Sequence, residues 1–268
     1  MSTSTKPNPY FALPQSPAET LDVAGASYRL DTVFKHDFWA AACLYVTDDP
    51  AATYPKIVVK FGRAHRYKLL PLRWLGRWMI GHECRIYEKL DGLAPAIPVY
   101  LGRLDAVSFA MEYVDAKPLD HCDEPPAGFF DRLVELFQAV HGCGVAYVDS
   151  NKRSNILVRP NGEPCLIDFQ ISQRRTVLTW WFIRYLQRKD IYHTLKHKRR
   201  MAPDELREDE TAASHRSGLL HRIHAKVSKF YRRARRKFLR KKYQSGTLDS
   251  PTADLETHHQ PEKESWRD

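Results

Sequence analysis

The most informative stretch of the chain lies between residues 147 and 170, where it reads YVDSNKRSNILVRPNGEPCLIDFQ. Two short apolar runs, at 155–158 and 165–168, flank the turn sequence Pro160-Asn161-Gly162. An apolar run, a turn that contains Asn-Gly and a second apolar run predict a β-hairpin. We therefore expect a hairpin whose last residue is an aspartate.

The polar residues around this hairpin indicate a chemistry. Asp149 precedes the first strand, Asn155 begins it, and Asp168 ends the second strand. Mg²⁺ prefers hard oxygen ligands and a carboxylate can orient an incoming hydroxyl, so this set suits metal-assisted phosphoryl transfer. The simpler alternative is that Asp149 and Asn155 only form turns, as such residues frequently do.

The residues before the hairpin predict an α+β fold. Runs rich in β-branched and aromatic residues read as strands at 29–34, 42–47 and 56–61. Helical spacing of apolar residues then predicts one helix over 75–90 and another that begins after residue 125. Alternating βαβ units are absent from this order, which disfavours a doubly wound parallel sheet.

The bulk composition excludes several classes of protein. No stretch approaches the ~20 apolar residues that cross a bilayer, and residues 1–26 lack the basic start and apolar run of a signal peptide. We therefore expect a cytoplasmic protein. The five cysteines form no C-x-x-C pair, which argues against a zinc site or a disulfide framework, and we interpret them as reduced and mostly buried.

The net charge of +10 comes from one segment of the chain. Residues 221–243 hold eleven Lys or Arg and no Asp or Glu, so the remainder of the chain is close to neutral. Apolar residues at steps of three and four predict an amphipathic cationic helix here. Such a helix would lie on an anionic membrane, contact nucleic acid, or dock on the rest of the chain. The aromatic run at 180–185 favours a peripheral position at the inner membrane surface, and nucleic acid is the least favoured partner.

A lysine at the end of an apolar run is a candidate for binding phosphate. Lys60 follows Ile57-Val58-Val59, and Glu83 lies in the predicted helix over 75–90. Because a buried lysine seldom lacks a partner, Glu83 would hold the ammonium while its charge faces phosphate oxygens. The alternative is a lysine at a strand end that extends to solvent.

In their order along the chain, these motifs resemble those of the protein-kinase-like superfamily. The resemblance is greatest to its small atypical branches: the RIO kinases, the lipopolysaccharide-core sugar kinases and the aminoglycoside phosphotransferases. Val59-Lys60 resembles the family's V-A-I-K lysine, and Glu83 resembles the glutamate that pairs with it. The run AMEYV at 110–114 resembles the hinge, which implies that Glu112 and Val114 meet the adenine of ATP.

The hairpin motifs carry the same resemblance. Asp149 matches the family's catalytic-loop aspartate, and Asn155 and Asp168 match its two metal ligands, with a similar spacing between them. The resemblance implies a two-lobed fold, with a small mixed or antiparallel sheet in the first lobe and a reduced helical second lobe. It also implies that Asp190 is the buried helix aspartate that steadies the catalytic loop, although a helix N-cap explains this residue equally well.

Three departures from the family pattern bear on function. The turn at 33–42, where the family covers the phosphates, contains no glycine, so we expect Lys35 or His36 to reach the phosphates by side chain instead. The loop between Asp149 and Asn155 is one residue longer than usual, and it places Lys152 where many protein kinases keep a lysine that contacts the transferred phosphate. Tyr147-Val148 replaces His-Arg, which removes the arginine that would bind a phosphorylated activation loop.

The resemblance implies an ATP- and Mg²⁺- or Mn²⁺-dependent kinase that transfers the γ-phosphoryl group to a hydroxyl of a protein, a lipid-linked sugar or a small molecule. The alternative is a catalytically inactive pseudokinase that acts as a nucleotide-binding, membrane-associated or nucleic-acid-associated module. The expected organisation is a disordered leader at 1–26, lobes at 27–113 and 114–213, a basic helix at 214–245 and a disordered tail at 246–268.

Overall fold

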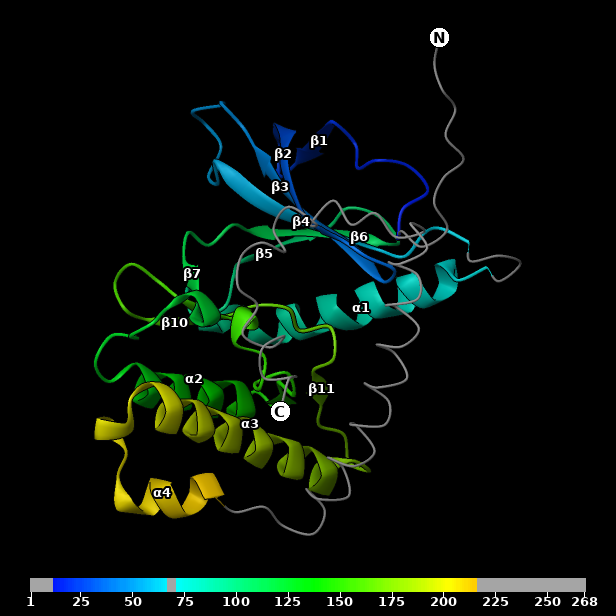
Figure 1. The fold of residues 1–268 in the computed structure, drawn as a ribbon. Helices are drawn as coiled ribbons and strands as arrows, with labels where there is room; N and C mark the ends of the chain where they lie inside the picture. The colour runs from blue at the N-terminus through cyan, green and yellow to red at the C-terminus, as the bar shows by residue number, and fades with distance from the viewer. Residues whose placement is uncertain (1–11, 67–70, 216–268) are drawn as a thin grey trace, which may run out of the picture.

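The computed structural model describes residues 12–66 and 71–215, which form two lobes (Figure 1). An antiparallel sheet with one long helix makes the first lobe, and the second lobe is mainly helical. The α+β class and the two-lobed arrangement of a small antiparallel sheet and a mainly helical second lobe are thereby confirmed. The predicted basic helix and tail lie outside the described residues from residue 216 onward.

Six strands form the sheet of the first lobe, in the order β1-β2-β3-β4-β6-β5 and antiparallel throughout. They are β1 (Thr20–Val23), β2 (Ala26–His36), β3 (Ala40–Val46), β4 (Lys56–Gly62), β5 (Tyr100–Arg103) and β6 (Ser108–Glu112). Both faces of β4 are covered: Val58 packs in the core shared with helix α1 (Arg73–Leu90), whereas Val59 packs with β2 and β3. Because side chains alternate along a strand, Lys60 lies on the face of Val58, toward α1 and the second lobe.

The sheet begins earlier than the sequence predicted. A disordered leader up to residue 26 is wrong from residue 12 onward, because Ala12 is fully buried and its backbone bonds to Asp37. Val23 pairs with Ala26 across a two-residue loop, Ala24-Gly25, in which both residues have positive φ. This is the conformation of a tight hairpin turn. Alanine is an uncommon residue at the first of these two positions, so the turn is not obvious from sequence.

Close backbone contact joins α1 to the end of β4. A Cβ added at Gly76 would lie 2.0 Å from the backbone oxygen of Arg63, and one added at Gly62 would lie 2.6 Å from Ile80 Cγ1. Only residues without a side chain permit this approach of helix to strand. The position of Glu83 relative to Lys60 depends on this contact, since the two residues lie on the two elements that it joins.

We expect Gly76→Ala to destabilise the protein by roughly 1–3 kcal/mol, because the methyl group forces the helix or the strand to move. The matched control is Gly81→Ala in the same helix, where the nearest atom to the new Cβ is Arg103 Nη1 at 3.6 Å. Alanine there improves helix propensity by up to ~1 kcal/mol. Urea unfolding of the three proteins measures both effects. Equal midpoints for the two variants would contradict the close contact at Gly76.

The second lobe follows a short linking segment. Its helices are α2 (Phe129–Gly142), α3 (Trp180–Met201) and α4 (Glu208–His215), with short 3₁₀ turns at η2 (Leu119–His121), η3 (Arg153–Asn155) and η4 (Pro203–Glu205); a further 3₁₀ turn, η1 (Asp91–Leu93), follows α1 in the first lobe. The predicted hairpin is present as β9 (Ile156–Val158) and β10 (Pro164–Leu166), although β10 ends two residues before Asp168, and β7 (Lys117–Pro118) pairs with β9. A further pair, β8 (Val145–Ala146) and β11 (Gln173–Arg174), borders the hairpin region.

The helix predicted over 75–90 corresponds to α1, and the helix predicted after residue 125 corresponds to α2. Within residues 12–66 and 71–215, no helix is long and apolar enough to cross a membrane. All five cysteines are free, and three of them, Cys43, Cys84 and Cys165, are buried, which agrees with the expected reduced state.

Candidate active site

A polar cluster joins three elements where the lobes meet. Lys60 Nζ, near the end of β4, lies 2.7 Å from Glu83 Oε1 in α1 and 2.6 Å from Asp168 Oδ1, two residues beyond β10. The side chains of Lys60 and Glu83 are 9% and 1% exposed, and that of Asp168 is 25% exposed. The alternative of a lysine that extends to solvent is therefore wrong. One cation lies between carboxylates from both lobes.

Lys60 and Asp168 stabilise each other's charged forms, whereas burial raises the pKa of the Glu83 carboxyl. Burial by itself would raise the pKa of the Asp168 carboxyl, but Lys60, and more weakly Lys152 and Lys35, hold it well below its usual range. Burial would likewise lower the pKa of the Lys60 ammonium, but the charges of Asp168 and Glu83 raise it above its usual range. Asp168 is therefore a carboxylate and Lys60 an ammonium at every physiological pH.

The loop before the hairpin places Asp149 and Asn155 in contact. Asn155 Nδ2 donates a hydrogen bond to Asp149 Oδ2 at 2.8 Å, and Asn155 is buried. The backbone oxygen of Asn155 accepts the N–H of Ile167 at 3.1 Å, so Asn155 lies beside the residue that precedes Asp168. Lys152 Nζ lies 3.9 Å from Asp168 Oδ2. The two groups of predicted site residues thus adjoin each other.

The backbone around these residues is strained. Val148 has φ 74° and Asp168 has φ 62°, in the left-handed region that a β-branched residue rarely adopts. The buried carboxylate of Asp190 accepts the N–H groups of Tyr147 and Val148 at 2.9 Å each, and it contacts His141 Nε2 at 3.1 Å. Asp190 lies in the middle of α3, so the N-cap alternative is wrong. Its hydrogen bonds offset the strain of the loop.

The longer loop after Asp149 is attached to the C-terminal half of α3. His197 Nε2 bonds to the backbone oxygen of Ser150 at 3.1 Å, and Lys196 Nζ donates to Asn151 Oδ1 at 3.2 Å. Both α3 residues lie about two turns beyond Asp190 on the helix. The extra residue of the loop is therefore accommodated as a supported turn rather than as an unattached bulge.

A side chain organises the turn without glycine between β2 and β3. Asp37 Oδ1 accepts the N–H groups of Trp39 and Ala40 at 2.8 and 3.0 Å. Lys35 forms an ion pair with Asp37 at 2.9 Å, and its charge also contributes to the low pKa of Asp168. Two amides of the turn are consequently bound to a carboxylate, and Lys35 is the cation that this turn presents toward the cluster.

Two further contacts hold the turn between β2 and β3 in place. Buried Arg63 donates from Nη1 to the backbone oxygen of Phe38 at 2.7 Å, and its guanidinium lies 3.8 Å from the centre of the Phe38 ring. His36 Nε2 accepts the N–H of Leu13 at 3.2 Å. Of the two residues predicted to reach phosphate, Lys35 is therefore the better candidate, because the ring of His36 holds the N-terminal segment.

Aromatic rings connect the cluster to both lobes. Phe169, next to Asp168, is fully buried, and its ring centre lies 5.1 Å from those of Tyr87 in α1 and Tyr147 in the loop. Tyr147 in turn packs against Phe137 of α2 at 5.7 Å. A continuous aromatic stack thus runs from the first lobe to the second, and it holds the position of Asp168.

The predicted hinge lies between β6 and β7. Glu112 is the last residue of β6, and its carboxylate accepts the N–H of Val99 at 3.2 Å. Its side chain therefore has a structural partner. The backbone groups of Val114 form no hydrogen bond with other described residues. A heteroaromatic ring that carries hydrogen-bond donors and acceptors on its edge would bond to the N–H and C=O of Val114.

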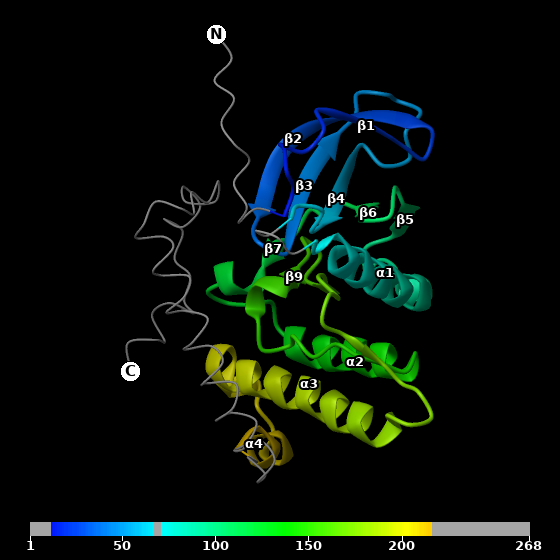
Figure 2. The ribbon, with the colours of Figure 1, turned by 90° about the vertical axis from the view of Figure 1, so that its right-hand side faces the viewer.

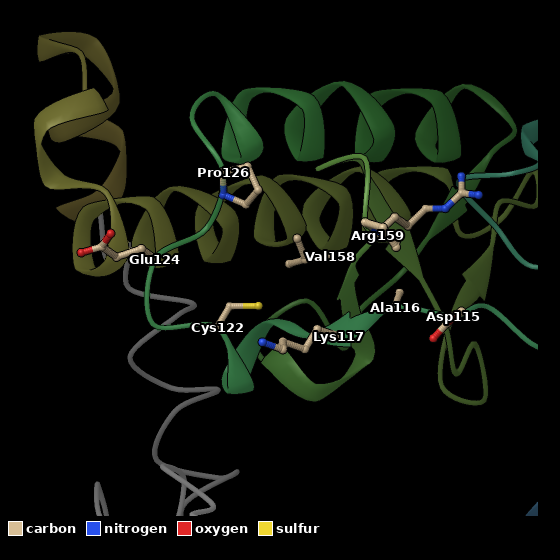
Figure 3. A pocket seen from close by; sticks show the side chains of 9 residues that line it. Asp115, Ala116, Lys117, Cys122, Glu124, Pro126, Val158 and Arg159 are labelled. Carbon is tan, nitrogen blue, oxygen red and sulfur yellow. The ribbon is translucent and has the colours of Figure 1, made fainter.

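A separate pocket of about 480 Å³ lies beside this hinge (Figure 3). Its walls come from the hinge, from the segment before α2 and from the end of β9; they include Asp115, Lys117, Cys122, Glu124 and Arg159. None of Lys60, Glu83 and Asp168 lines it. Its balanced charges give it no evident preference for an anionic or a cationic ligand.

The residues present fit a Mg²⁺ ion that shares its ligands with a substrate. No group of three or more His, Cys, Asp or Glu that would hold a metal occurs among the described residues. Mg²⁺ usually keeps several waters and binds one or two protein oxygens together with phosphates. Asp168 supplies a permanent carboxylate, and the amide nitrogen of Asn155 is bound to Asp149, which leaves Asn155 Oδ1 as the end that accepts a cation.

Sequence reasoning missed the residues that support the site. The Asp37 turn has a recognisable local pattern, since Asp side chains frequently bond amides two and three residues later. Arg63 and His197 have no such pattern. Their partners, Phe38 and Ser150, are distant in sequence, so only the folded chain reveals these contacts.

His197 makes stability depend on pH. Burial lowers its pKa to about 4, below the ~6.5 of an unfolded chain. Between these two pH values His197 is protonated in the unfolded state but neutral in the folded state. The contribution of neutral His197 to the free energy of unfolding is therefore complete above pH ~6.5. It declines as the pH falls toward 4, by roughly 3 kcal/mol in total. Urea unfolding of parent and His197→Gln at several pH values tests this. The parent should lose more stability than the variant on acidification, and identical pH slopes would contradict it.

No protein-family model and no curated protein matches the sequence. Similar solved structures include the Rio2 kinase from Chaetomium thermophilum and the complex of that kinase with ADP/Mg²⁺ and phosphoaspartate. Each is 17% identical, with a TM-score of 0.49 over 68% of this chain. The alignments cover 56% of the complex and 58% of the other structure, so the chain spans little more than half of their length.

Proposed function

We propose that this chain is an atypical kinase that transfers the γ-phosphoryl group of ATP to a hydroxyl group. The observation that carries the proposal is the position of Lys60, between Glu83 of the first lobe and Asp168 of the second. A permanent cation and a permanent carboxylate side by side suit a nucleotide phosphate and its metal ion. The acceptor would be a hydroxyl of a protein, a lipid-linked sugar or a small molecule.

Each site residue has a part in this reaction. Lys60, oriented by Glu83, would bind phosphate oxygens, and Lys35 would add a second cation from the turn between β2 and β3. The backbone of the hinge at Glu112 and Val114 would bind the adenine. Such cations stabilise charge on the phosphates without reorganising during the reaction.

Asn155 and Asp168 would hold Mg²⁺, or Mn²⁺, which when bound neutralises charge on the nucleotide phosphates. Asp149, oriented by the amide of Asn155, would accept the proton of the acceptor hydroxyl. The acceptor oxygen bonds to the γ-phosphorus while the bond from that phosphorus to the β,γ-bridging oxygen breaks, which yields ADP and a phosphoester. Lys152, beside Asp168, would neutralise charge on the transferred group.

The second candidate function is that of a pseudokinase, which binds nucleotide without transferring phosphate. The observation that favours it is the turn between β2 and β3, because the amides of Trp39 and Ala40 are bound to Asp37 and are not presented to phosphate. The assembly of Asp149 and Asn155 beside Asp168 favours the enzyme, since nucleotide binding alone does not require a hydroxyl-orienting carboxylate.

Nucleotide binding tests the metal site. We expect Asp168→Asn to weaken ATP binding at least tenfold in the presence of Mg²⁺ and to remove most of its dependence on Mg²⁺, because the neutral amide is a poor ligand for a hard cation. Titration calorimetry with and without Mg²⁺ measures both effects. The control is Asp48→Asn, whose carboxyl group is 92% exposed. A variant that binds ATP with Mg²⁺ as tightly as the parent would contradict the assignment of Asp168.

Turnover tests the reaction itself. In the parent we expect Mg²⁺-dependent formation of ADP, and in Asp149→Asn a loss of roughly 10²-fold or more with ATP affinity largely retained, because a general base contributes to the chemical step. Release of ADP from both proteins and from Asp48→Asn would be followed in parallel. Binding of ATP by the parent without any turnover, across a panel of hydroxyl acceptors, would favour the pseudokinase.

A further inference from the structure

Large apolar side chains are concentrated on one side of the molecule. Nine such residues are exposed in the described part of the chain, and eight of them belong to two segments, 74–78 and 171–182. These eight are Trp74, Trp78, Ile171, Val177, Leu178, Trp180, Trp181 and Phe182, which together we call the aromatic face. Monomeric soluble proteins rarely expose so many large apolar residues together, and such a patch usually marks an interaction surface.

The two segments lie on the same side of the fold. In Figure 1 the N-terminal ends of α1 and α3 are both on the right, opposite β7, and Figure 2 turns this side toward the viewer. His82 Nε2 of α1 bonds to the backbone oxygen of Ser172 at 2.7 Å, and the Trp78 ring stacks on His82 at 5.8 Å. These contacts join the α1 part of the aromatic face to the segment that follows Asp168.

Positive charge surrounds the aromatic face. Residues 71–82 and 169–189 contain no Asp or Glu. They supply six exposed arginines: Arg73, Arg77, Arg174, Arg175, Arg184 and Arg188. None of the six forms an ion pair within the described residues, although other arginines and lysines of the chain do. These six charges are thus available to an anionic partner.

We propose that the aromatic face binds an anionic lipid membrane. Tryptophans and aliphatic side chains would enter the interface between headgroups and acyl chains, and the arginines would meet lipid phosphates. This is a surface on the described part of the chain, separate from the basic segment at 221–243. It would bring the cleft at Asp168, three residues before Ile171, close to the membrane.

The chemistry of the face argues against other occupants. A second copy docking by the same face, or the chain's own segment at 221–243, would bring positive charge against positive charge. A nucleic acid would use arginines and aromatic rings, but it has no use for Val177 and Leu178, which are 90% and 86% exposed. Lipid is the partner that uses the arginines, the aromatic rings and the aliphatic side chains together.

The test uses the full chain and sedimentation with vesicles of phosphatidylcholine, with and without phosphatidylglycerol. The parent should bind the anionic vesicles, and more weakly at high salt. Val177→Ser/Leu178→Ser should weaken binding about tenfold or more without changing the unfolding temperature, because both side chains are exposed. Arg184→Gln/Arg188→Gln should also weaken it, while the control Arg29→Gln/Lys56→Gln, with exposed cations on the sheet outside this face, should not.

A second measurement distinguishes insertion of the aromatic face into the lipid from electrostatic attraction of the basic segment at 221–243 to the membrane surface. Four of the chain's six tryptophans lie in the aromatic face, so brominated lipids should quench a large share of the fluorescence of the bound parent. Trp180→Phe/Trp181→Phe should lower that quenching. Vesicle binding that is unchanged in all face variants, or binding without quenching, would overturn the proposal. So would loss of single-stranded RNA binding or of self-association in the face variants while vesicle binding remains.

Discussion

The structure depends on one buried ammonium group. Lys60 lies between Glu83 and Asp168, and these three residues come from a central strand, the long helix of the first lobe and the hairpin of the second. An unpaired charge in this position would be strongly unfavourable, and breaking a buried pair costs about 3–5 kcal/mol. The lobes must therefore close on each other closely enough to bring both carboxylates to the lysine.

Other features of the fold follow from this requirement. The two faces of β4 are both packed, which turns Lys60 toward α1, and Gly62 and Gly76 allow the helix to approach the strand closely enough for Glu83 to reach it. On the other side, Phe169 packs between Tyr87 and Tyr147 and keeps Asp168 in place. Strain at the left-handed residue Val148 is offset by hydrogen bonds to the buried carboxylate of Asp190.

The parts that differ from the kinase pattern share a physical solution. Where the expected turn lacks glycine, the carboxylate of Asp37 binds the turn amides and Arg63 holds Phe38. Where the loop after Asp149 is longer, α3 supports it through His197 and Lys196. In both cases a side chain from another element replaces what backbone flexibility or a shorter loop would have provided. The turn and the loop are thereby both anchored by side chains.

Local patterns in the sequence were sufficient for the α+β class, for strands β2, β3 and β4, for helices α1 and α2, and for the β9–β10 hairpin. Each depends on periodicity or turn residues within a few positions, so neighbouring residues carry the information. The start of the sheet was missed because Ala24-Gly25 is a weak turn pattern. The roles of Asp149, Asn155 and Lys152 remain predictions, although the structure places these residues beside Asp168 or in contact with one another.

What the sequence by itself determined is the set of chemical groups and the elements that carry them: Lys60 on a buried strand, Glu83 on a helix, and Asp168 at the end of a hairpin. Only the tertiary structure decided the contacts of Arg63 with Phe38 and of His197 with Ser150, and the contact that joins α1 to the segment after Asp168. The physical reason is distance along the chain. Backbone periodicity acts over a few residues, whereas burial and charge pairing act between any residues that the closed fold brings together.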